Sequence, residues 1–250
     1  MIRSYRELRA DSRSALLGNY GTVFLATLIS SAIVLVVDSL LSPASTQTFL
    51  GVFLYSVSTF AVYTIGTMLK AGQYFMSLNI ARRGKTNIAD LFLSFRYEPL
   101  KAVLIAVLIS LIESLCTLPI ILTVNSLLLY GAISVVGTSV AFTSVGGIVA
   151  ALLIAFAITL VLETIVAFMY SQALFLYIDH QEYSAIDCLR ESRLLMRGQK
   201  LRLLGLKLSF IGYYLLVVLT FGLGIIWVQP YLQVSQANFY MDLTGNYHPY

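Results

Sequence analysis

Residues 20–41 read YGTVFLATLISSAIVLVVDSLL, and this stretch decides the fold class of the chain. It contains a single charged residue, Asp38. A bilayer core needs roughly 20 apolar residues per helix, so the stretch predicts a transmembrane helix. It does not resemble a cleaved leader, because Glu7 and Asp11 precede it and residues 42–44 (SPA) make a poor cleavage site. We therefore expect a retained first span.

The rest of the chain has the same apolar character. Its 250 residues are 58% hydrophobic and 11% charged, whereas a soluble domain is about a quarter charged. We predict an all-α fold, a single integral membrane domain over residues 1–250. It is a polytopic transmembrane helical bundle of about six spans in three hairpins. The further candidate spans are 50–70, 102–118, 147–178, 204–222 and 225–241.

The basic residues indicate the orientation of these spans. Fifteen of the sixteen lysines and arginines lie in three segments that precede the three hairpins. The positive-inside rule places such segments in the cytoplasm. We therefore expect a multi-pass protein of a bacterial plasma membrane with a cytoplasmic amino terminus. The fifteen residues are Arg3, Arg6, Arg9, Arg13, Arg82, Arg83, Lys85, Arg96, Lys101, Arg190, Arg193, Arg197, Lys200, Arg202 and Lys207.

Two parts of this topology stay open. Residues 119–146 are apolar enough to hide another helix, but one more crossing would put the basic segment 190–207 outside. Either the third span continues past a kink at Pro119, or the segment is re-entrant. No basic residue follows 225–241, so charge does not indicate the side of the carboxyl terminus.

Amphipathic helices are expected on the cytoplasmic side, over residues 1–19 and 184–198. Each hairpin is preceded by a capping residue with an acid three positions later, a spacing typical of helix starts. Gly198 stands where the second of these helices would end. The pattern indicates either a threefold internal repeat or ordinary basic loops with common caps. The three pairs are Ser4 with Glu7, Asn87 with Asp90, and Ser184 with Asp187.

Apart from Lys207, which belongs to the third basic segment, four charged residues fall within the predicted spans. Asp38 lies near the outer face, Lys70 near the inner face, and Glu113 and Glu163 near the middle. A carboxylate at mid-membrane faces the bundle, finds a partner or stays protonated. Glu113 and Glu163 therefore indicate a proton or cation relay, a site for a cationic ligand, or neutral side chains that hydrogen-bond between helices.

Patterns for catalysis and for metals are missing from the sequence. It has no G-x-S-x-G, H-E-x-x-H or Walker motif, and its two histidines lack metal-ligand spacing. We therefore expect no enzyme, no catalytic residue, no metal and no cofactor. The basic residues are spread over three loops among acids, which argues against nucleic-acid binding.

The last third of the chain carries a resemblance to a known family. The elements that carry it are SRLLMRGQK (192–200), LSFIGYYLL (208–216), WVQPY (227–231) and ANFY (237–240), with weaker agreement in RELRADSRSALLGNYG (6–21) and DLFLSF (90–95). They resemble the bacterial integral-membrane family catalogued as domain of unknown function 975. That family is distantly similar to the membrane domain of some glycerophosphodiester phosphodiesterases, which would imply a lipid-proximal role. No biochemical activity is implied.

This resemblance singles out residues inside the basic segment. Ser192, Met196, Gly198 and Lys200 match the family elements, and Arg197 lies among them. We treat these five as candidates for contact with lipid headgroups.

Three functions are compatible with these patterns. The first is a non-enzymatic scaffold or accessory subunit, with a membrane-protein partner or a homo-oligomer. The second is a lipid-binding or lipid-handling protein whose partners are anionic membrane lipids. The third is a transporter or channel that uses Glu113 and Glu163.

Overall fold

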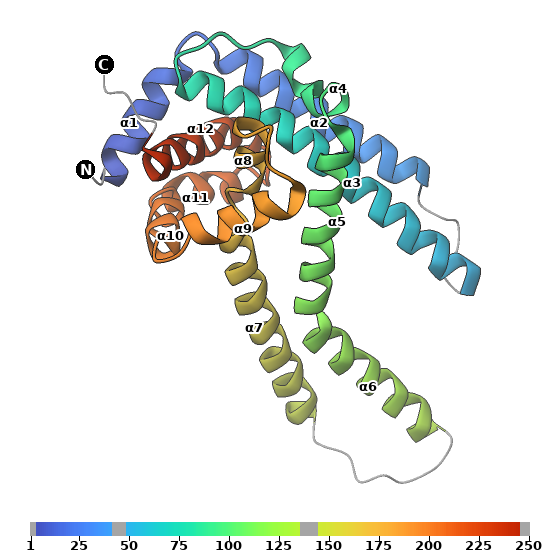
Figure 1. Cartoon of the computed structure of the whole chain (residues 1–250). Coiled ribbons are helices and arrows are strands. Elements are labelled where there is room, and N and C mark those ends of the chain that lie inside the picture. The colour runs from blue at the N-terminus through green and yellow to red at the C-terminus, as the bar shows by residue number, and fades with distance from the viewer. Residues whose placement is uncertain (1–3, 42–48, 136–144, 246–250) are drawn as a thin grey trace. The chain divides into compact units, whose positions relative to one another are not determined.

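A computed structural model describes residues 4–41, 49–135 and 145–245, and over these ranges the chain forms helices and turns without a strand (Figure 1). The all-helical prediction is confirmed for these ranges. The elements are α1 (Tyr5–Leu16), α2 (Tyr20–Leu41), α3 (Phe49–Ala81), the 3-10 helix η1 (Ile88–Phe92), α4 (Leu93–Arg96), α5 (Pro99–Cys116), α6 (Leu118–Val135), α7 (Val145–Met169), α8 (Ala173–Asp179), α9 (Ala185–Leu195), α10 (Lys200–Leu208), α11 (Ile211–Leu219) and α12 (Ile225–Thr244).

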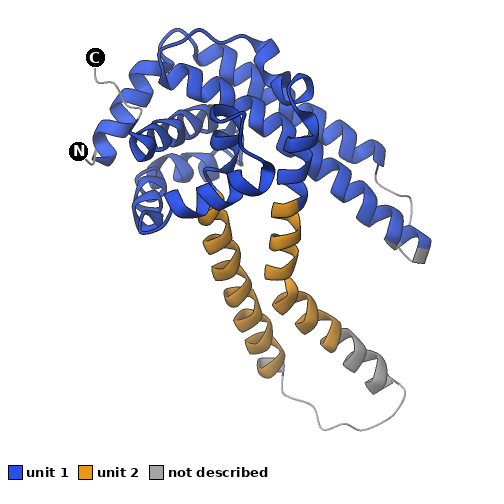
Figure 2. Ribbon diagram, in the orientation of Figure 1, with its two compact units in different colours: residues 1–107, 171–250 blue, residues 108–170 orange. Residues whose placement is uncertain are grey.

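The chain divides into two compact units, shown in different colours in Figure 2. Unit 1 comprises residues 1–107 and 171–250, and unit 2 comprises residues 108–170. In unit 2, α6 packs along α7. Many apolar side chains of α7, such as Leu153 and Phe156, are exposed, as expected of a helix that faces lipid.

Within the described residues, three helices are long and apolar enough to cross a membrane. They are Tyr20–Leu41, Pro99–Cys116 and Gly147–Asp179, the last of which covers most of α7 and all of α8. The pair α10 and α11, bent by 46°, would make a fourth if both helices form one broken span. These elements agree with three of the six predicted stretches, or with four if α10 and α11 form one span. The arrangement of six spans in three hairpins stays a prediction.

The segment after the third predicted span forms a helix of its own. α5 ends at Cys116 and α6 begins at Leu118, so Thr117 separates the two helices. Pro119 lies in the first turn of α6, where its missing N–H leaves no helical hydrogen bond unmade. The remainder of the predicted segment 119–146 includes residues 136–144, which lie outside the described residues.

The core of unit 1 is built around α12, the helix predicted as the sixth span. It packs against α1, α2, α3 and α11. Tyr240 stacks on Phe175, which stacks on Tyr74, with ring centroids 5.2 and 4.6 Å apart. The polar side chain of Asn238 is buried and donates to the Ser12 hydroxyl at 2.8 Å. α12 therefore places its polar residues against neighbouring helices.

The carboxyl end of α12 lies beside two of the basic segments. The Tyr240 hydroxyl donates to Asp179 at 3.1 Å, and Arg82 donates to the same carboxylate at 2.7 Å. Arg202 forms an ion pair with Asp242 in the next turn of the helix. These contacts place the end of α12 next to Arg82 and Arg202, while the side of the membrane on which the carboxyl terminus lies stays open.

The expected cytoplasmic helices begin where their caps predict. In α1 the Ser4 hydroxyl accepts from the Glu7 N–H, and Glu7 accepts in return from the Ser4 N–H. Ser184 and Asp187 make the same exchange at the start of α9. Hydrogen bonds from Ser184 lower the pKa of Asp187, since they stabilise its ionised form. α9 ends at Leu195, shortly before Gly198.

Candidate functional site

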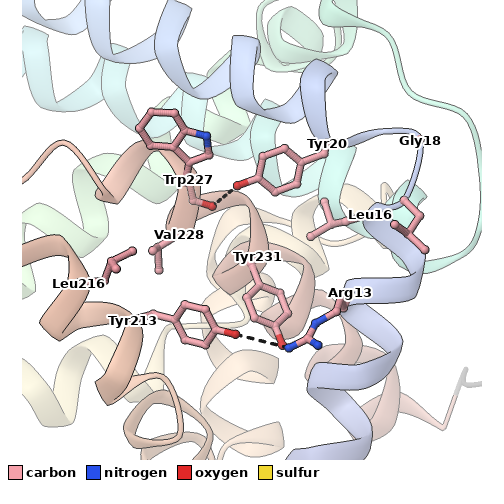
Figure 3. A pocket seen from close by; sticks show the side chains of 10 residues that line it. Arg13, Leu16, Gly18, Tyr20, Tyr213, Leu216, Trp227, Val228 and Tyr231 are labelled. Carbon is pink, nitrogen blue, oxygen red and sulfur yellow. Dashed lines mark hydrogen bonds between the residues drawn. The ribbon is translucent and has the colours of Figure 1, made fainter. Parts of the chain in front are cut away.

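An apolar groove opens in unit 1 between α1, the start of α2, α11 and α12 (Figure 3). Its volume of about 460 Å³ lies within the range of about 300–1,000 Å³ that small-molecule pockets occupy. It is built from two stretches of chain that lie about 200 positions apart in the sequence. The lining residues are Arg13, Leu16, Leu17, Gly18, Tyr20, Tyr213, Leu216, Trp227, Val228 and Tyr231.

The turn between α1 and α2 forms one wall of the groove. Gly18 has φ +87°, a left-handed conformation that glycine adopts without steric cost. The Asn19 N–H donates to the Leu16 carbonyl at 3.0 Å and closes the turn. As a result Leu16 is buried, whereas Leu17 is 76% exposed at the edge.

α11 and α12 supply the floor and the opposite edge. Val228 and Tyr231 are buried on the inner face of α12, while Leu216 and Trp227 are exposed. The Trp227 ring is tilted against Phe24 at a centroid distance of 5.6 Å. The groove therefore has an apolar floor and opens along an edge of exposed apolar side chains.

One end of the groove is polar and positively charged. The Arg13 guanidinium donates to the Tyr213 hydroxyl at 3.4 Å, and the Tyr213 ring meets the Tyr231 ring edge-on at 5.5 Å. Tyr231, and after it Tyr213, raises the pKa of Arg13 above its ordinary value. An arginine guanidinium is positive at physiological pH in any case. Figure 3 shows Arg13 and Tyr213 at one end of the labelled side chains and Trp227 at the other.

The hydroxyls of the other tyrosines hold the walls together. Tyr20 donates to the Trp227 carbonyl, which joins α2 to α12 (Figure 3). Tyr231 donates to the Arg9 carbonyl at 3.1 Å, which joins α12 to α1. The groove therefore combines one cation with a rigid apolar channel, a combination that suits an anionic amphiphile.

Two residues predicted within the spans meet at a separate cavity. Asp38 and Lys70 both line a space of about 440 Å³ between α2, α3 and α12, together with Ser30, Gln73 and Gln229. Ser30 and Gln73 are buried and hydrogen-bonded to each other. The structure therefore brings together the two charged residues that the sequence placed nearest the membrane faces.

Glu113 and Glu163 lie in unit 2, on α5 and α7. Each side chain is partly exposed. Neither lines the groove or the cavity at Asp38 and Lys70. A relay through these two carboxylates stays a prediction.

The candidates in the basic segment have different surroundings. Ser192 and Met196 are fully buried: the Ser192 hydroxyl accepts from the Gln172 N–H at 3.2 Å, and Met196 contacts the side-chain amide of Gln172. They hold α9 against the start of α8, so their burial leaves no surface for a headgroup. Gly198 takes φ +77° in the turn before α10.

Of the remaining candidates, Arg197 is exposed and Lys200 partly exposed. These two residues keep a surface that headgroups can reach.

The groove residues were not predicted from the sequence, although Tyr213, Trp227 and Tyr231 lie in the family elements. Aromatic residues with polar tips are enriched at membrane interfaces, and this signal could have found them.

Over the described residues, the chain belongs to the class of all-helical proteins with three or four helices that are able to cross a membrane, and its unit 1 holds an apolar groove with one cation. The family described as "Protein of unknown function (DUF975)" matches residues 1–247, so the chain belongs to this family. No curated protein and no solved structure matches the chain significantly. The expected distant similarity to glycerophosphodiester phosphodiesterases is therefore not supported.

Proposed function

We propose that this protein is a plasma-membrane protein that binds an anionic phospholipid in the groove of unit 1. The observation that carries the proposal is that the apolar groove has one permanent cation, Arg13, at its end. An acyl chain would lie along Leu16, Leu216 and Val228, and the lipid phosphate would meet the guanidinium. Arginine suits this role because its planar donors match the oxygens of phosphate.

The position of α1 supports this assignment. It is a capped amphipathic helix that turns its apolar face to α12 and carries Arg6, Arg9 and Arg13. Such helices lie at the level of the headgroups, where basic residues attract anionic lipids. With a cytoplasmic amino terminus, the groove would draw its lipid from the inner leaflet.

The lining also favours binding over chemistry. The ten groove residues include no histidine, cysteine or carboxylate. A hydrolytic or transfer reaction would need a nucleophile with a base, or a metal site. The proposal therefore keeps the expectation of a non-enzymatic protein.

A scaffold or accessory-subunit role is a second proposal. It is supported by the exposed apolar side chains of α7 in unit 2, which a partner helix could cover as well as lipid. Crosslinking in native membranes tests it, since a scaffold should yield a reproducible partner. Recovery of lipid alone would count against this role.

The groove contains the single tryptophan of the chain, which provides a direct test of lipid binding. Phosphatidylglycerol with brominated acyl chains, titrated into purified protein in detergent micelles, should quench Trp227 fluorescence saturably. Arg13→Gln should weaken phosphatidylglycerol binding about fivefold, because one basic residue contributes roughly that factor at an anionic surface. Binding of brominated phosphatidylcholine should change little.

Arg6→Gln is the matched control. It removes the same charge from the same helix, but Arg6 does not line the groove. Its quenching curve should follow that of the unmodified protein. Quenching that rises linearly without saturation, or an equal loss in both variants, would refute a specific groove site.

A further inference from the structure

A second, smaller cavity in unit 1 gathers positive charge. It lies between α3, α10, α11 and α12, and its volume is about 200 Å³. Lys70 from α3 and Lys207 from α10 both line it. Gln229, Gln233 and Gln236 line its α12 side. Two ammonium groups therefore share one small polar space.

No carboxylate is found among the described residues that line this cavity. Asp38 lies at the neighbouring cavity, which shares Lys70 and Gln229 with this one. In the described part of the chain, Asp38 and Lys70 form no ion pair within 4.0 Å; Lys70 instead lies over the Tyr74 ring at 5.8 Å. Two like charges in a partly enclosed space repel each other, and a bound anion would relieve that repulsion.

Two buried polar atoms at this cavity lack hydrogen-bond partners. Gln233 is 2% exposed and Ser235 is 1% exposed. The Gln233 side-chain nitrogen donates to Gln73, but the Gln233 Oε1 and Ser235 Oγ atoms have no partner within the described ranges. Leaving such atoms unpaired is unfavourable, so a ligand that satisfies both would be stabilised.

We propose that this cavity binds a phosphate group, either free phosphate or the phosphomonoester headgroup of a lipid such as phosphatidic acid. Its charged oxygens would accept from Lys70, Lys207 and the Ser235 hydroxyl. A singly protonated phosphate also carries one O–H, which would donate to Gln233 Oε1. The volume is below the roughly 300 Å³ of a drug-sized pocket and suits a small anion.

This site is independent of the groove, because the two share no lining residue. Failure of one proposal therefore leaves the other standing. The cavity also differs in chemistry, since its polar lining residues come from three helices, α3, α10 and α12, whereas the groove is charged at one end only.

The test is calorimetric titration of the purified full chain with inorganic phosphate and, separately, with short-chain phosphatidic acid. Saturable binding of either ligand is expected. Binding of free phosphate identifies a soluble anion as a sufficient ligand. Binding of phosphatidic acid alone identifies the lipid headgroup when Lys70→Gln weakens it and Arg13→Gln does not, because the groove is also proposed to bind an anionic phospholipid. Lys70→Gln and Lys207→Gln should each weaken binding about tenfold, because each removes a charged donor.

Lys85→Gln is the control, since Lys85 is an exposed lysine that follows α3, the helix that carries Lys70, but does not line the cavity. It should leave binding unchanged. Thermal unfolding without ligand checks the fold, and Lys70→Gln and Lys207→Gln should have the melting temperature of the unmodified protein. Added phosphate should raise the melting temperature of the unmodified protein but not that of these two variants. Binding of neither ligand by the unmodified protein, or equal weakening in all three variants, overturns the proposal.

Discussion

Gly72→Ala is expected to destabilise unit 1 by about 3 kcal/mol or more, which would lower the melting temperature by roughly 10 °C. Gly72 lies on α3 where this helix crosses η1. A Cβ atom there would lie 2.8 Å from the Leu91 Cα and would overlap the Leu91 carbonyl. Leu91 is fully buried, so its backbone has no room to move away.

Gly66→Ala, six residues earlier on the same helix, is the control. Its Cβ would meet only the Val34 Cγ2 atom at 3.8 Å, an ordinary van der Waals contact. Alanine is favoured over glycine inside helices by about 1 kcal/mol, so this change should preserve or raise stability. The measurement is thermal unfolding followed by circular dichroism at fixed detergent concentration. Equal melting temperatures for the two variants would contradict close packing at Gly72.

Asp242→Asn is expected to cost about 3–5 kcal/mol of unfolding free energy, because it breaks a buried ion pair. The Asp242 and Arg202 side chains are only 6% and 12% exposed. Arg202 also lies over the Phe239 ring at 5.2 Å, which holds its charge inside unit 1. Without the Asp242 carboxylate, the Arg202 guanidinium is still shielded from water, which is unfavourable for a charge, and the attraction to Asp242 that offset this is gone.

Glu98→Gln is the comparison for this prediction. Glu98 also forms an ion pair, with Lys101, but its side chain is 55% exposed. An exposed pair contributes up to about 1 kcal/mol, so this change should hardly alter the melting temperature. The double variant Arg202→Met with Asp242→Leu should recover part of the stability lost in Asp242→Asn. If Asp242→Asn proves as mild as Glu98→Gln, the pair does not stabilise the fold.

Short-range sequence patterns, namely apolar runs and helix caps, were enough to predict much of the fold. The stretch 20–41 coincides with α2, and the caps at Ser4 and Ser184 begin α1 and α9. These features depend on neighbouring residues, since a cap bonds within one turn and a span requires only a continuous apolar run. A single sequence is sufficient for predictions of this kind.

Hydropathy gave less guidance where helices pack against one another. α12 reads as a weak span because Gln229, Gln233 and Gln236 interrupt it. In the structure it forms the centre of unit 1, and the Gln233 side-chain amide bonds to Gln73 across 160 positions of sequence. Gln233 and Asn238 are buried and hydrogen-bond to side chains of other helices, Gln73 and Ser12, which no local pattern reveals.

An apolar, helical chain with capped basic helices follows from the order of the residues alone, because composition, periodicity and capping act over a few residues. The contact of Arg13 with Tyr213, and the cavity that Lys70 and Lys207 share, follow from the packing of helices in three dimensions. Both sites join helices far apart in the chain. Their geometry depends on how whole helices pack, and packing is a property of side-chain shape and long-range contact.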